Sequence, residues 1–193
     1  STILKIIMYS LLQLVAFNSI AEENLNSIYS RWNDLKTDSL FNLGKNFLEK
    51  EQRDSALICF SICGNKATTE MYKKEKSICI NALTNSARLY FCFYDYDKAC
   101  QQLIKAIKLC DESKMDKELT GIYMEQGALM MTYAQQRPKQ QNFKEAEEAY
   151  RKSFWNALKH KQYSSLITAL FNLGNRFYSA QKIEEMKEEL DAF

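Results

Sequence analysis

Cysteine side chains can form disulfide bonds, bind metals or pack as small hydrophobic residues, and the chain contains six cysteines. The positions are Cys59, Cys63, Cys79, Cys92, Cys100 and Cys110. An even number of cysteines in an exported chain permits disulfide bonds. A zinc site would need four ligands, yet no C-x-x-C motif occurs and the only histidine, His160, is distant in sequence. We expect most of the cysteines to act as small buried hydrophobic residues, with one or two disulfides as the alternative.

Motifs for catalysis are missing from the sequence. It contains no Gly-rich phosphate loop, no G-x-S-x-G and no H-E-x-x-H. Glutamates cluster at 145–148 and 184–189, but beside lysines on helices such clusters are typical of solvated faces. We therefore expect a protein that is not an enzyme and that holds no cofactor or metal.

The composition favours long helices. One proline and five glycines in 193 residues leave little room for turn-rich β structure. The chain has 26 basic and 24 acidic residues, a net charge of +2, and the two signs are interleaved without a run of five basic residues. This charge pattern argues against a nucleic-acid partner.

A repeated segment is the strongest signal in the chain. The sequence LFNLG-x-x-F at 40–47 returns at 170–177. Large and small residues at i, i+3, i+4 and i+7 predict one face of a helix. After a polar turn, a second short helix carries Ala56 and Phe60. We expect Gly44 and Ala56 to let the two backbones approach while Phe60 fills the space around them.

Weaker copies lie between these two. The four copies begin at Leu40, Leu83, Tyr123 and Leu170. The third contains seven extra residues, including 137–139, before its second helix resumes at Phe143. In the fourth copy, the second helix matches the repeat pattern less well, because Met186 stands where a small residue is expected.

This pattern resembles the tetratricopeptide repeat, whose helices carry large-x-x-Leu-Gly-x-x-Tyr and then Tyr-x-x-Ala. The resemblance implies an all-α fold, a right-handed superhelical solenoid of antiparallel helix pairs with about four repeats. The array would cover 37–193, with units at about 37–79, 80–119, 120–166 and 167–193. The long units are more similar to those of bacterial regulatory tetratricopeptide proteins than to co-chaperone arrays.

The resemblance also implies a concave groove lined by the first helices. The position between the first large side chain and the Leu-Gly pair would face it. That position is Asn42, Asn85 and Asn172, with Glu125 in the third copy; Lys45, Arg88 and Asn175 lie one turn on, with Phe41, Phe91, Phe171 and Tyr178 as apolar neighbours. An asparagine carries a donor and an acceptor and so can pair with an extended peptide backbone. The alternative is that the asparagines bond a neighbouring helix and the aromatic rings belong to the core.

The expected partner is a protein or peptide in this groove. Co-chaperone repeats clamp a C-terminal carboxylate with a lysine–asparagine pair, but Phe41 and Lys45 stand at those places here. The resemblance therefore gives no chaperone-tail ligand. A dimer contact through the uncapped C-terminal end is a further option.

The N-terminus has the order of a secretory signal peptide. Lys5 precedes an apolar run at 6–17, and small residues at Ser19 and Ala21 precede two glutamates. We interpret 1–21 as a leader, or alternatively as a structural N-terminal helix, and 22–36 as a helix or linker. No cysteine stands at the cleavage site, which argues against a lipoprotein.

Together these features predict an exported, periplasmic or extracytoplasmic interaction module. A fuller version is the sensory region of a larger bacterial protein that continues past Phe193, with membrane contact only through the leader or a downstream segment. The alternative is a cytoplasmic scaffold or assembly subunit whose apolar N-terminal segment is a structural helix.

Overall fold

The computed structural model describes residues 30–176 and Glu188. Across this part of the chain the structure contains helices and no strands, which confirms the all-α prediction. A helical turn at residues 30–33 precedes the main helices. These are α2 (Thr37–Glu49), α3 (Arg53–Asn65), α4 (Lys73–Cys92), α5 (Tyr96–Glu112), α6 (Asp116–Gln136), α7 (Gln140–Lys159) and α8 (Tyr163–Arg176).

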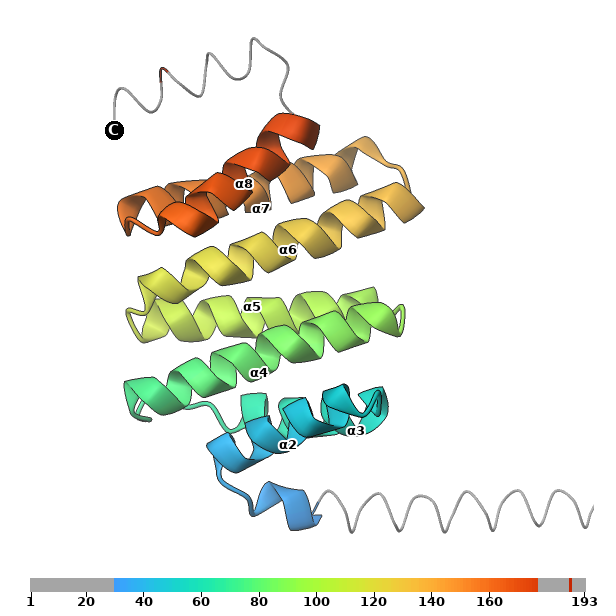
Figure 1. Cartoon of the computed structure of the whole chain (residues 1–193), viewed down its shortest axis with the longest axis vertical. Coiled ribbons are helices and arrows are strands. Elements are labelled where there is room, and N and C mark those ends of the chain that lie inside the picture. The colour runs from blue at the N-terminus through green and yellow to red at the C-terminus, as the bar shows by residue number, and fades with distance from the viewer. Residues whose placement is uncertain (1–29, 177–187, 189–193) are drawn as a thin grey trace, which may run out of the picture.

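The helices pack in neighbouring antiparallel pairs that follow one another along the long axis of the molecule (Figure 1). Within a pair, α2 contacts α3, α4 contacts α5, and α6 contacts α7. The first helices, α2, α4, α6 and α8, also contact one another in sequence. The break between α6 and α7 falls at residues 137–139, where the sequence predicted extra residues.

Four of the turns between helices share one geometry. Each places a residue other than glycine at positive φ, and the N–H of the next residue bonds to the carbonyl five positions back at 2.8–2.9 Å. The residues at positive φ are Glu51, Tyr94, Lys114 and Lys161. This is the Schellman arrangement, which satisfies the last carbonyls of a helix and reverses the chain within three residues. This turn geometry could not be predicted from the sequence, because glycine is the usual residue at the position with positive φ.

Small residues on the first helices let the second helices approach closely, as predicted. A Cβ atom built on Gly44 would lie 2.7 Å from the ring of Phe60, and one on Gly127 would lie 2.6 Å from the ring of Tyr150. Real Cβ atoms do not come this close to a neighbour, so each aromatic ring occupies the volume that a side chain would need. The absence of a Cβ at these two positions therefore sets the spacing within the pair.

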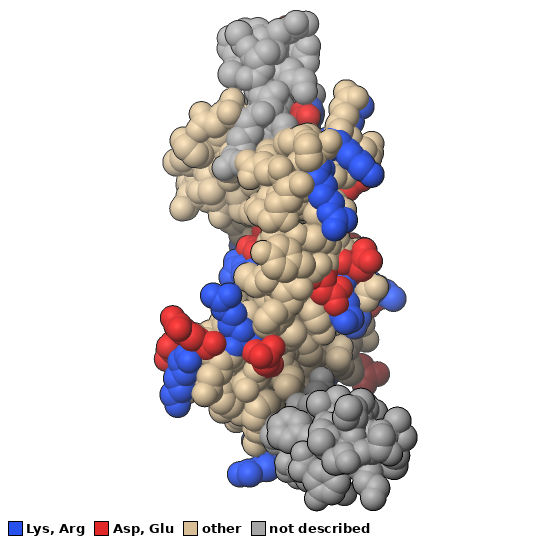
Figure 2. All heavy atoms as spheres, turned by 90° about the vertical axis from the view of Figure 1, so that its right-hand side faces the viewer, with Lys and Arg blue, Asp and Glu red and all other residues tan. Residues whose placement is uncertain are grey.

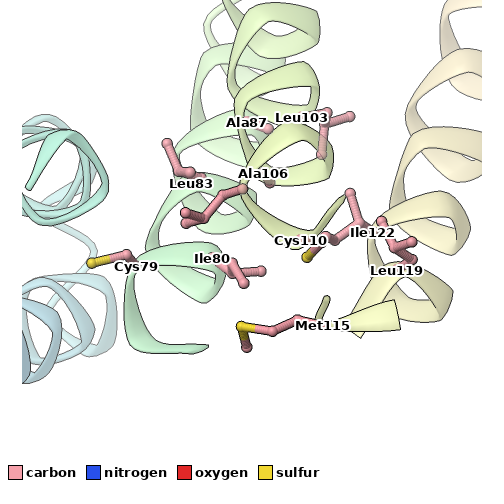
Figure 3. Packing of buried hydrophobic residues seen from close by; sticks show 11 residues of the cluster. Cys79, Ile80, Leu83, Ala87, Leu103, Ala106, Cys110, Met115, Leu119 and Ile122 are labelled. Atoms are coloured by element: carbon pink, nitrogen blue, oxygen red, sulfur yellow. The ribbon is translucent and has the colours of Figure 1, made fainter. Parts of the chain in front are cut away.

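The core is a series of three clusters rather than one centre. One joins α2 and α3 to α4, the next joins α4 and α5 to α6, and the third joins α6 and α7 to α8. Figure 3 shows the middle cluster, in which Leu83 of α4, Leu103 of α5 and Ile122 of α6 contribute to one buried layer. Each cluster thus joins the two helices of a pair to the helix that follows them.

The cysteines mostly pack in this core, and all six are free thiols. Four are fully buried: Cys59, Cys63, Cys79 and Cys110. Cys79 turns its sulfur away from the other labelled side chains, toward the preceding helix pair (Figure 3). There it meets the thiol of Cys63 on α3. A hydrogen bond between the thiols of Cys63 and Cys79 raises the pKa of Cys63 and lowers that of Cys79. Cys92 departs from the expectation because its position on α4 is exposed.

The last described helix differs from the first at matching positions. Leu40 of α2 is fully buried, whereas Leu170 of α8 is 47% exposed. On α2 this face is covered by Phe60 of α3, but a Cβ on Gly174 would meet nothing within 4 Å. The expectation that Leu170 and Gly174 pack like their counterparts stays a prediction, because the second helix that would cover them lies outside the described residues. The expected leader at 1–21 and the second helix around Met186 lie outside the described residues.

Candidate binding face on the first helices

The predicted groove residues of α4 lie on one side of that helix and contact each other. Asn85 is half-buried, and its Nδ2 donates to the backbone oxygen of Asn81 at 2.9 Å. Its Oδ1 accepts from Nη1 of Arg88 at 3.4 Å. Since an amide has two N–H donors and two acceptor positions, Asn85 keeps some hydrogen-bonding capacity. Both of these hydrogen-bond partners belong to α4 itself, whereas the alternative predicted a bond to a neighbouring helix.

Arg88 connects α4 to the next first helix. Its Nη2 lies 2.6 Å from Oε2 of Glu125 on α6, and the Arg88 side chain is 54% exposed while that of Glu125 is 14% exposed. The hydrogen bond to Glu125 raises the pKa of Arg88. Glu125, which stands where the other copies carry asparagine, thus forms with Arg88 an ion pair that bridges successive helix pairs.

On α2 the predicted residues divide between surface and core. Asn42 and Lys45 are exposed. Phe41 is half-buried, and its ring centroid lies 5.5 Å from that of Phe60. Asn42 and Lys45 are therefore available at the surface, whereas Phe41 contributes to the core beneath them.

On α8 the predicted residues are more open. Asn172 is half-buried, and its Nδ2 lies 3.7 Å from the sulfur of Met124 on α6. Asn175 is exposed, and Phe171 is 66% exposed. Tyr178 lies outside the described residues. Because α8 contacts α6, Asn172 adjoins the helix that carries Glu125.

Two features were missed by the sequence argument. The first is the pairing of Glu125 with Arg88, although an acidic residue replacing asparagine opposite a basic one was a readable signal. The second is a group of rings where α4, α5 and α6 meet, in which Tyr96 contacts Phe91 and Tyr133 at centroid distances of 4.9 and 4.7 Å. No periodicity marks this group, because its members come from helix ends rather than from one helical face.

The described residues show no metal centre and no membrane span. They contain no group of three or more His, Cys, Asp or Glu side chains that could hold a metal ion. Among the helices of residues 30–176, none is both long and apolar enough to cross a membrane. Comparisons with protein-family models, curated proteins and solved structures give no match to this chain. Its chemistry must therefore be argued from the residues themselves.

The side chains that the first helices present are mainly polar. They include an exposed amide at Asn42, a half-buried amide at Asn172, cations at Lys45 and Arg88, and an exposed ring at Phe171.

Proposed function

We propose that this chain is a non-enzymatic tetratricopeptide-like module that binds a protein or peptide on the face formed by α2, α4, α6 and α8. In this proposal the helix pairs form a right-handed superhelical array, and the first helices line its inner side. The observation that carries it is the succession of contacts from α2 to α4, α6 and α8, with a polar residue at matching positions. Asn42 is exposed, and Asn85, Glu125 and Asn172 are half-buried. A continuous row of such residues can follow an extended backbone.

The geometry of the face supports this proposal in two ways. The ion pair between Arg88 and Glu125 fixes α4 relative to α6, so that the row is organised before a ligand arrives. The close contact at Gly44 fixes α3 behind α2, and the one at Gly127 fixes α7 behind α6. A preorganised surface loses less conformational entropy on binding than a mobile one.

We propose further that the module is the exported, sensory or interaction region of a larger bacterial protein. This part rests on the charge, apolar run and small residues at 1–21 and on the long repeat units. Mass spectrometry of the N-terminus tests it on protein from the native host. Export predicts that the mature chain begins near Glu22, whereas an intact N-terminal segment would contradict it.

The binding proposal can be tested without knowing the natural ligand. A random dodecapeptide library on phage is selected on the wild-type protein, and the selected peptides are then measured against Asn85→Ala combined with Asn172→Ala. Losing two amide contacts should weaken binding about tenfold or more. A matched control is Asn65→Ala combined with Asn142→Ala, which changes asparagines on α3 and α7. Equal affinities for wild type and the first-helix variant, with both folded, would refute the proposal.

A further inference from the structure

A small cavity lies where the ends of α4 and α6 meet α5 and the first half of α7. Its volume is about 150 Å³. At the ~30 Å³ that a water takes in the liquid, this is room for about five non-hydrogen atoms. The walls include the apolar side chains of Leu103, Leu129 and Met130. An unbranched chain fits such a space better than a ring system or a bulky anion.

Aromatic rings form one side of this cavity. Phe91, Tyr96 and Tyr133 line it, and Tyr96 contacts the other two rings. The guanidinium of Arg137 lies 5.8 Å from the centroid of Tyr96 and 5.7 Å from that of Tyr133, and it lines a neighbouring groove rather than the cavity. The tyrosine rings therefore already hold a cation, as electron-rich ring faces do.

Two carboxylates complete the lining. Asp97 comes from the first turn of α5 and Glu145 from α7, and both are exposed. No lysine, arginine or histidine is among the described residues that line the cavity. Burial raises the pKa of Cys100, and the negative charges of Asp97 and Glu145 raise it further, so both carboxylates act on the same small volume. Apolar walls, aromatic rings and two anionic groups are complementary to an alkyl chain that ends in a cation.

We propose that this cavity binds a primary alkylammonium group, the side chain of a lysine on a partner protein. The four methylene groups of lysine would pack against Leu103 and Met130, and the ammonium would lie between the tyrosine rings and the two carboxylates. Two exposed aromatic side chains line the groove next to the cavity: Phe93 is 41% exposed and Tyr94 is 74% exposed. A partner protein that inserts a lysine into the cavity would also cover these two rings. Figure 2 views the side on which the α4–α5 and α6–α7 turns lie, and charged residues of both signs are dispersed there over a mainly uncharged surface.

This site is independent of the proposed first-helix face. Part of its lining comes from α4 and α6, but the two carboxylates come from α5 and α7. The substitutions that test this site therefore leave the asparagines of the first-helix face unchanged. Failure of lysine binding in this cavity can therefore be told apart from failure of peptide binding on α4 and α8.

The test uses Nα-acetyl-lysine methylamide as the probe and the methyl resonance of Met130 as the reporter, in protein with 13C-labelled methionine methyl groups. We expect a saturable shift with millimolar affinity, and none from the Nε-acetylated compound, which lacks the charge. Asp97→Asn combined with Glu145→Gln should weaken binding about tenfold. The control Asp54→Asn combined with Glu49→Gln makes the same chemical changes on α3 and α2 and should leave binding unchanged.

Three results would overturn the proposal: equal shifts with the Nε-acetylated compound, unchanged affinity in the pocket variant, or no saturable shift of Met130. Should the pocket variant not fold, the salt dependence of binding to wild-type protein takes its place. An ion-pairing site loses affinity as sodium chloride is raised, whereas salt-independent binding would contradict the role of the carboxylates.

Discussion

Arg88 of α4 and Glu125 of α6 join two successive helix pairs through an ion pair 2.6 Å long between Nη2 and Oε2. The two side chains differ in exposure to solvent: that of Glu125 is largely shielded by neighbouring atoms, and that of Arg88 remains about half exposed. Removing the arginine leaves a shielded carboxylate without its partner, which is usually the more costly of the two losses.

A double-mutant cycle measures this pair. Arg88→Ala should lower the free energy of unfolding by about 1 kcal/mol, and Glu125→Gln by less, since solvent screens the exposed side of the pair. The coupling energy should be about 0.5–1 kcal/mol and should fall with added salt. Urea unfolding of wild type, both single variants and the double variant provides the values. Strictly additive single effects would show that the pair does not hold α4 against α6.

Gly127 and Gly121 offer a matched comparison on α6. A Cβ on Gly127 would meet the ring of Tyr150 at 2.6 Å, whereas one on Gly121 would meet nothing within 4 Å. Gly127→Ala should therefore destabilise the protein by about 1–3 kcal/mol through overpacking. Gly121→Ala should stabilise it by up to about 1 kcal/mol, because alanine favours the helix. Thermal unfolding of both variants measures these changes in stability. Changes of the same sign in the two variants would contradict the close packing of α6 on α7.

These glycines show where the sequence was sufficient. Gly44 and Phe60 were expected to be in contact because small and large residues recur at helical spacing, and the structure bears this out. The turns at Glu51 and Lys114 were not foreseeable, because the residues that adopt positive φ are not glycines. The cavity beside Tyr96 was missed for another reason. Its residues come together only when the ends of four helices pack, and no local pattern encodes that meeting.

Asp95 gives the α4–α5 turn a defined pH dependence. Its carboxylate pairs with Nζ of Lys98 at 2.7 Å and accepts from the backbone N–H of Lys98, which caps α5. The side-chain hydrogen bond from Lys98 lowers the pKa of Asp95 in the folded state. A lowered pKa means that the stabilisation is present above the unfolded pKa of about 3.9 and is lost as the pH falls through the folded value.

The variant Asp95→Asn isolates this contribution, since asparagine can still cap the helix but does not titrate. Between pH 7 and pH 3 the wild type should lose more thermal stability than the variant does. Asp54→Asn, a change in the first turn of α3, serves as the control. Parallel melting curves for wild type and Asp95→Asn across this pH range would show that the lowered pKa has no consequence for folding.

Thiol labelling distinguishes the buried cysteines from the exposed one. Burial raises the pKa of Cys59 and of Cys110 to about 12, so both are protonated and shielded at pH 8. Cys92 is exposed on α4. Since the thiolate is the reactive form, a disulfide reagent should label Cys92 in the native protein and reach the buried thiols only after unfolding. Cys92→Ser should remove the fast phase; a fast phase that persists would place another thiol at the surface.

The most direct measurement for the central claim is the location of a bound peptide. With a peptide selected from the phage library, side-chain amide resonances of 15N-labelled protein should shift at Asn42, Asn85 and Asn172, on three different first helices. The amides of Asn65 and Asn156, on α3 and α7, serve as internal references and should stay in place. The account predicts shifts confined to the first-helix residues. Shifts at Asn65 and Asn156 with the first-helix amides unmoved would contradict it.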